Sequence, residues 1–182
     1  MSKPVFVTSN KHKAQHFEQL VGLPVDHAAV ELEELQSLDI ELVAEHKARQ
    51  AYAALGRPVI IDDIALGFTA LHGLPGTFIK YFVEAENGLE TLCRMLDFST
   101  DRTATAVAVL AYFDGTTLKL FRGEVQGTIA EHARGTNGHG WDAVFCPDGY
   151  NDLTRAELGD VDYIAVYKQL RHVDQLREFL EQ

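Results

Sequence analysis

The sequence is poor in cysteine and in positive charge. Its two cysteines, Cys93 and Cys146, lie far apart, so they form neither a disulfide framework nor a metal knuckle. The 16 Lys and Arg are outnumbered by 27 Asp and Glu, for a net charge of −11. Nonspecific nucleic-acid binding depends on neutralising phosphates, so this charge argues against a nucleic acid polymer as partner. A small anionic ligand remains possible, because it needs only a local basic pocket.

Long apolar runs are also missing. No stretch approaches the length that crosses a bilayer, and the first residues resemble a strand and not a signal peptide. We therefore expect no membrane partner and a reducing, cytoplasmic location. No Gly-x-Ser-x-Gly elbow occurs, which argues against a serine hydrolase. With 182 residues and 46% hydrophobic content, the chain suits a single domain over residues 1–182.

A continuous apolar stretch leads into two adjacent carboxylates. Val59–Ile61 follow Pro58 and predict a strand buried on both faces, ending at Asp62 and Asp63. Two neighbouring carboxylates repel each other and lose hydration there, so a divalent cation would stabilise them. Aspartates after a strand are about as often turn residues, and that alternative stays open.

The N-terminal segment has the pattern of an anion site. Residues 4–8 predict a strand, which is followed by Ser9, Asn10 and a helix pattern through Phe17. A strand, a polar turn and a helix N-terminus place backbone N–H groups where an anion binds. Lys11 and Lys13 add positive charge. A capped surface helix with solvated lysines is the alternative.

The rest of the chain alternates between strand and helix patterns. Helical spacing predicts a helix over 40–55 that Gly56 closes, with Lys47 on its polar side, where a solvated surface role is the alternative. Two strands, 102–113 and 118–129, meet at an Asp114-Gly115 hairpin. The other expected elements are a strand within 25–35, a glycine-rich connection over 66–76, a helix that begins over 77–83 and is continued by 88–96, a glycine loop over 133–142, a strand over 143–146, and a final helix from Tyr167.

These motifs together resemble the inosine triphosphate pyrophosphatase family, and the resemblance covers nearly the whole chain. Some of these motifs match the phosphate-binding residues of the family, and others match its base-binding residues. The matching stretches are Val7-Thr-Ser-Asn10-x-x-Lys13, Glu34-x-Gln36, Lys47, Asp62-Asp63, Gly73-Leu-Pro75-Gly76, Leu120-Phe-Arg122-Gly123 and Gly140-Trp141-Asp142-x-x-Phe145-x-Pro147-Asp148-Gly149-Tyr150.

The resemblance implies an α/β fold with a long twisted mixed sheet flanked by helices, in two lobes around a central cleft. It implies a nucleotide pyrophosphohydrolase that cuts the α–β phosphate bond of a nucleoside triphosphate to give the monophosphate and pyrophosphate, and a homodimer. It also implies Mg²⁺, with Mn²⁺ as a substitute. The implied residues are Glu34, Asp62 and Asp63 for the metal, Asp63 and Lys13 for catalysis, Thr8, Ser9, Asn10, Lys13 and Lys47 for the phosphates, and His139, Gly140, Trp141 and Asp142 for the base.

The C-terminal motif departs from the family. A lysine and a Ser-His-Arg triplet usually read the 6-keto edge of the base; here their positions hold Tyr163 and Tyr167-Lys168-Gln169. We expect Tyr163, Lys168 and Gln169 to contact the base instead. The substrate is then a non-canonical purine nucleotide, such as ITP, dITP or XTP, or one with a modified base. A catalytically silent nucleotide-binding protein and a phosphatase for another phosphate ester remain as alternatives.

Overall fold

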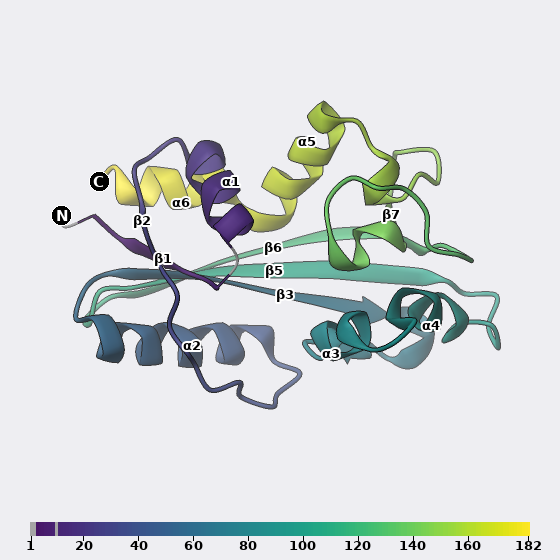
Figure 1. Cartoon of the computed structure of the whole chain (residues 1–182), viewed down its shortest axis with the longest axis horizontal. Coiled ribbons are helices and arrows are strands. Elements are labelled where there is room, and N and C mark those ends of the chain that lie inside the picture. Colours follow the sequence, from purple (N-terminus) through teal and green to yellow (C-terminus); the bar gives the residue numbers. More distant parts are fainter. Residues whose placement is uncertain (1–2, 10) are drawn as a thin grey trace. The chain divides into compact units, whose positions relative to one another are not determined.

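A mixed seven-stranded sheet flanked by helices forms the fold (Figure 1). The computed structural model describes residues 3–9 and 11–182. The strand order is β2-β1-β3-β5-β6-β7, with β4 paired to β3. β1 runs parallel to β2 and β3, while β4 and β7 are antiparallel to their neighbours. The predicted α/β class with a mixed sheet is confirmed. The strands are β1 (Val5–Val7), β2 (Asp26–Ala28), β3 (Val59–Phe68), β4 (Pro75–Gly76), β5 (Thr103–Phe113), β6 (Leu118–Ile129) and β7 (Phe145–Pro147).

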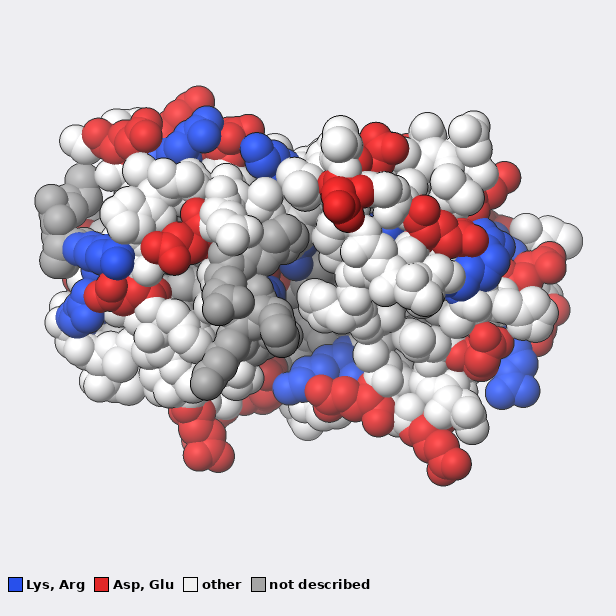
Figure 2. All heavy atoms as spheres, turned by 45° about the horizontal axis from the view of Figure 1, so that its top comes forward, with Lys and Arg blue, Asp and Glu red and all other residues white. Residues whose placement is uncertain are grey.

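The helices connect these strands. They are α1 (Lys11–Val21), α2 (Ile40–Leu55), α3 (Ile79–Glu84), α4 (Gly88–Arg94), α5 (Asp160–Arg171) and α6 (Val173–Leu180), with short 3₁₀ turns η1 (Thr69–Leu71), η2 (Gly140–Ala143) and η3 (Arg155–Glu157). No helix in the described part of the chain is long and apolar enough to cross a membrane. On the face shown in Figure 2, Lys and Arg side chains are interspersed with Asp and Glu.

The chain divides into two compact units. The first comprises residues 1–64, 108–123 and 171–182, and the second comprises 65–107 and 124–170. The long strands β3, β5 and β6 contribute residues to both units. The cleft expected between two lobes stays a prediction.

In the first unit, helices cover both faces of the sheet. Figure 1 shows α2 on one face and α1 with α6 on the other. Phe6 on β1 stacks against Phe17 on α1 with ring centroids 4.0 Å apart, and α1 contacts α6. Both rings are fully buried, so they anchor the N-terminal helix to the sheet.

The predicted helix over 40–55 is confirmed as α2. The Asp39 carboxylate accepts hydrogen bonds from the backbone N–H groups of Glu41 and Leu42, which caps the N-terminus. Gly56 ends the helix in the left-handed region, with φ of 62°, and its N–H donates to the Tyr52 carbonyl. The buried stripe of α2 consists of Ile40, Val43, Ala44, Ala48 and Ala51.

The second unit contains α3, α4, most of α5, and the loop that carries η2. α3 packs on α4, and α4 and η3 each contact η2. Arg102 joins this unit internally, because its guanidinium donates to the carbonyls of Cys93, Ile129 and Ala130. The η2 turn is therefore packed against α4 and η3.

Several predicted boundaries are wrong. β3 does not end at Asp62 and Asp63 but continues to Phe68. Gly67, which suggested a connection, lies inside the strand, where a Cβ would come within 2.8 Å of the Gly73 carbonyl oxygen. The predicted final helix is two helices, because His172 adopts a left-handed φ of 47° between α5 and α6. β2 is only three residues long, and the strand expected over 143–146 is displaced to β7 by the η2 turn.

Candidate functional site

The two central aspartates lie side by side within β3, in the first unit. Successive side chains of a strand point to opposite faces of the sheet. Asp62 accordingly meets Lys13 on α1 and Arg171 at the end of α5, while Asp63 meets Lys47 on α2. The two carboxylates therefore have different partners.

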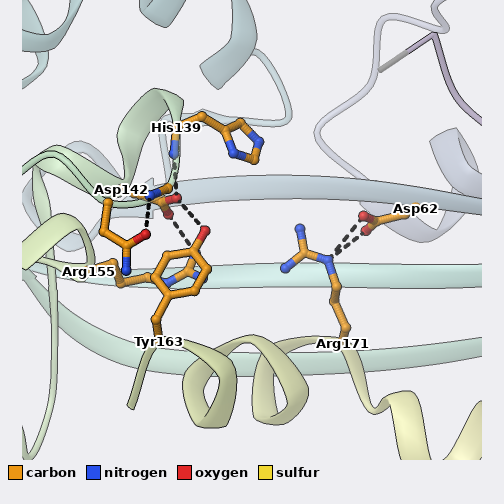
Figure 3. A network of polar contacts seen from close by, with 8 residues as sticks. Asp62, His139, Asp142, Arg155, Tyr163 and Arg171 are labelled. Carbon is orange, nitrogen blue, oxygen red and sulfur yellow. Dashed lines mark hydrogen bonds and ion pairs between the residues drawn. The ribbon is translucent and has the colours of Figure 1, made fainter. Parts of the chain in front are cut away.

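Asp62 is fully buried between two cations. The Arg171 Nε donates to both carboxylate oxygens, at 3.2 and 3.0 Å, and Figure 3 shows this side chain directed at Asp62. The Lys13 Nζ lies 2.8 Å from Oδ2 and donates to the Asp62 backbone carbonyl at 3.1 Å. Burial alone would raise the pKa of Asp62, but the Arg171 and Lys13 charges outweigh it and hold the pKa below the ordinary value. The lowered pKa favours the ionised form of Asp62, which pairs with Lys13.

Asp63 differs from Asp62 in its cationic partner and in the direction of its pKa shift. The Lys47 Nζ lies 2.6 Å from Asp63 Oδ1 and 2.9 Å from Glu34 Oε2, so one ammonium bridges two carboxylates. Asp63 Oδ2 is buried and has no hydrogen-bond partner among the described residues. Burial raises the pKa of Asp63 above its ordinary value, although the Lys47 charge and hydrogen bond act to lower it. Burial also acts against the Lys47 charge, but Asp63 and Glu34 outweigh it and raise the pKa of Lys47.

This first cluster consists of Lys13, Glu34, Lys47, Asp62, Asp63 and Arg171. It offers a carboxylate with raised pKa and an unpaired oxygen, together with ammonium groups that can hold anions. Such a set can accept a proton from water while binding a polyanion. Sequence reasoning missed Arg171, because its partner Asp62 is 109 residues away in the chain. The only available signal was that a buried Asp62 would require a cation.

The structure describes only part of the N-terminal turn that was predicted to bind phosphate. The Thr8 carbonyl lies 2.6 Å from His27 Nε2, Ser9 is exposed, and Lys13 reaches Asp62 from α1. Asn10 lies outside the described residues.

A divalent metal fits part of the first cluster. Within the described ranges, no three His, Cys, Asp or Glu side chains are grouped so as to hold a metal ion. Asp62 already pairs with Arg171 and Lys13. The unpaired, buried Oδ2 of Asp63 and the exposed carboxylate of Glu34 are the oxygen ligands that remain. Mg²⁺ commonly binds one or two carboxylates and takes its other ligands from water and phosphates, so this donor set is compatible with it.

A second cluster of polar side chains lies in the second unit, around Asp142 in η2. Asp142 is 3% exposed, and its carboxylate accepts three hydrogen bonds. Arg155 Nη1 donates to Oδ1 at 2.6 Å, while the Tyr163 hydroxyl and the His139 backbone N–H donate to Oδ2 at 2.9 and 3.0 Å. Figure 3 shows Arg155 and Tyr163 directed at Asp142. Tyr163 and Asp142, both predicted as base contacts, are thus bonded to each other.

Arg155 is the residue that sequence reasoning missed here. Its Cζ lies 4.6 Å from the Tyr163 ring centroid and 5.6 Å from that of Trp141. Trp141 also makes an edge contact with Phe145, with centroids 5.6 Å apart. The only sign of a buried role for Arg155 in the sequence was its position directly before Ala156, which is itself buried.

The glycine loop packs tightly on this cluster. A Cβ on Gly138 would come within 2.2 Å of Asp142 Oδ2 and 2.7 Å of the Tyr163 hydroxyl, so no side chain fits there. Gly140, which begins η2, also has a positive φ of 63°. On α5, Lys168 is half-buried and Gln169 is exposed, and neither forms a polar contact with Asp142, Arg155 or Tyr163 among the described contacts. These two predicted base contacts are therefore not brought into the second cluster.

The fold and the first cluster define a class of α/β protein with a site that combines paired cationic and carboxylate side chains. The model of the Ham1 family matches residues 4–179, and the chain belongs to that family. Among curated proteins, it is similar to "Inosine triphosphate pyrophosphatase" of Kluyveromyces lactis, at 37% identity over 99% of this chain and 97% of that protein. It is also similar to "dITP/XTP pyrophosphatase" of Methanopyrus kandleri, at 33% identity over 97% and 95%.

Solved structures give the same family. The Ham1 protein of Staphylococcus aureus has a TM-score of 0.78 at 30% identity and covers 98% of both chains. A HAM1 protein of Coxiella burnetii has a TM-score of 0.84 at 25% identity, covering 100% of this chain and 99% of its own. The expected family and the mixed-sheet fold are therefore confirmed.

Proposed function

We propose that the protein is a nucleotide pyrophosphohydrolase that cleaves non-canonical purine nucleoside triphosphates between the α- and β-phosphates, giving the monophosphate and pyrophosphate. The observation that carries this proposal is similarity over nearly the whole chain to relatives named for inosine triphosphate, dITP and XTP. The first cluster supplies the chemical support, because it combines cations for a triphosphate with an ionisable carboxylate.

In this proposal, Asp63 orients the attacking water and accepts its proton through the buried, unpaired Oδ2. Lys47 holds Asp63 in place and faces the phosphates, and Lys13 is held for the same purpose by Asp62. Phosphoryl transfer needs positioning and charge neutralisation more than covalent chemistry, which suits a site of this composition. Thr8, Ser9 and Asn10 complete the phosphate contacts.

We propose that Mg²⁺ is the cofactor, with Mn²⁺ as a substitute. Asp63 and Glu34 would hold it, and Asp62, which was expected as a third ligand, would act by positioning Lys13. When bound, the ion neutralises phosphate charge.

We also propose a cytoplasmic homodimer that uses the segment 73–82. Leu74 and Tyr81 support this, because they are apolar side chains exposed within that segment. The free, buried thiols of Cys93 and Cys146 are compatible with a reducing compartment.

A substrate panel tests the activity. Purified protein is incubated with ITP, dITP, XTP, GTP, ATP and CTP in the presence of Mg²⁺, and pyrophosphate and orthophosphate are measured separately. We expect pyrophosphate from the non-canonical purines in preference to ATP and CTP, and loss of release with EDTA. Orthophosphate as the product would indicate a phosphatase, and no product from any nucleotide would refute the proposal.

A further inference from the structure

The guanidinium of Arg155 keeps one complete edge without a hydrogen-bond partner. Arg155 is 2% exposed, and its Nη1 donates to Asp142. Both Nε and Nη2 are buried and have no hydrogen-bond partner in the described structure. In the planar guanidinium, these two nitrogens carry parallel N–H bonds along the same edge.

Unpaired buried donors are uncommon in native proteins and cost free energy. The rings of Trp141 and Tyr163 stabilise the Arg155 charge but contribute no carbonyl or carboxylate acceptor along this edge. Asp142 already balances the charge, so an additional anion is not required. A neutral planar group with two adjacent acceptors, flanked by aromatic rings, fits this environment better than a phosphate does.

We propose that Arg155 determines base specificity by donating from Nε and Nη2 to the O6 and N7 acceptors of a 6-oxopurine. This inference rests on the proposed function and identifies the part of the base that is read. Guanine presents O6 and N7 as two acceptors, which arginine binds bidentately, and hypoxanthine and xanthine share this edge. Adenine places an amino donor beside N7, so it meets the Arg155 edge with one mismatched group.

The same geometry also changes the roles that we assign to the residues next to Arg155. Arg155 supplies the cation next to Asp142, while Tyr163 occupies the position of the lysine expected from the family motif. Asp142 acts as the anchor of Arg155 and Tyr163. Both donor nitrogens are closed to water, so a base reaches them when a neighbouring side chain turns aside. Trp141 contacts Arg155 and is the only tryptophan in the chain, so its emission reports this event.

The test compares ITP with 7-deaza-ITP, in which a C–H group replaces N7. Nucleotides are titrated with EDTA in place of Mg²⁺, and the Kd is measured from Trp141 emission. We expect 7-deaza-ITP to bind wild type about 10- to 150-fold more weakly, as for loss of one hydrogen bond from a charged donor. In Arg155→Lys, which keeps a charge for Asp142 but lacks the paired donors, the ratio of the two Kd values should fall to within about twofold of unity.

Arg94→Lys, an exposed arginine on α4, is the matched control and should keep the wild-type ratio. A purely structural role of Arg155 would weaken both nucleotides equally and leave the ratio unchanged in Arg155→Lys. That result, or equal binding of ITP and 7-deaza-ITP by wild type, would overturn the inference. Pyrophosphate release from ITP, measured in parallel, tests the proposed function separately, because the N7 dependence of binding does not require turnover.

Discussion

Both clusters pair a buried aspartate with a buried arginine, but the two aspartates have different partners. In the first unit, Arg171 and Lys13 both bind Asp62, and the neighbouring Asp63 keeps an unpaired carboxylate oxygen. In the second unit, Asp142 accepts three hydrogen bonds, and Arg155 keeps two unpaired donors.

The two clusters therefore offer different kinds of interaction. An unpaired acceptor on a carboxylate with raised pKa can take a proton or bind a cation. Unpaired donors beside aromatic rings can do neither, but they can pair with the acceptors of a planar ligand. The first cluster therefore offers an acceptor for a proton or a cation, and the second offers donors for the acceptors of a planar ligand.

The largest effect is expected for Asp63→Asn. The amide cannot accept the proton of the attacking water, so kcat should fall by about 10²- to 10⁴-fold. Because burial disfavours the charged carboxylate and Lys47 keeps its contact with Glu34, the free energy of unfolding should stay the same or rise. Pyrophosphate release and urea unfolding measure the two effects. Full activity in this variant would show that Asp63 is not the base.

Sequence reasoning predicted the parts of this protein that depend on local pattern. α2 has a capping Asp39, a helical stripe of apolar residues and a terminal Gly56, and the β5–β6 hairpin has its Asp114-Gly115 turn. The family motifs likewise led to the family assignment, which is confirmed.

Sequence reasoning failed where distant segments decide the outcome. Gly67 lies in the part of β3 that pairs with β4, where its partner is Pro75. The partners Arg171 and Arg155 lie 109 and 13 residues from their aspartates. The break at His172 had no local signal, because the residue is neither glycine nor proline. The two adjacent aspartates have different partners because β3 continues through them, and the sequence pattern, which ended the strand there, did not indicate this.

The next effect concerns stability. Arg171→Met and Arg155→Met each remove the arginine from a buried carboxylate, which typically costs about 3–5 kcal/mol. Asp62 would keep Lys13, whereas Asp142 would keep only hydrogen bonds from Tyr163 and His139. We therefore expect Arg155→Met to be the more destabilising variant in urea unfolding, with exposed Arg94→Met near wild type.

Pairing each arginine variant with Asp→Asn at its partner removes the unpaired charge. Arg155→Met with Asp142→Asn, and Arg171→Met with Asp62→Asn, should both recover much of the lost stability. If Arg171→Met were the more destabilising variant, the second cation at Asp62 would not provide the compensation inferred from its position.

The smallest effect is a displacement of the acid limb of the pH–rate profile. Asp63 must be ionised to accept a proton, and burial raises its pKa, so kcat/KM should rise with pH through a midpoint above the ordinary aspartate value. Asp62 has a lowered pKa, so its contribution to stability is present above the unfolded value and is lost only as pH falls through the lower folded value. Activity should therefore disappear on acidification before this contribution does.

Lys47 should influence the midpoint pH of the acid limb. Its charge and hydrogen bond lower the pKa of Asp63 and partly oppose burial, so Lys47→Met should move the midpoint to higher pH. The profile of kcat/KM gives the midpoint in each protein, and circular dichroism over the same pH range shows whether the fold persists. Loss of activity together with the fold in wild type would assign the acid limb to unfolding, whereas an unchanged midpoint in Lys47→Met would assign it to a group other than Asp63.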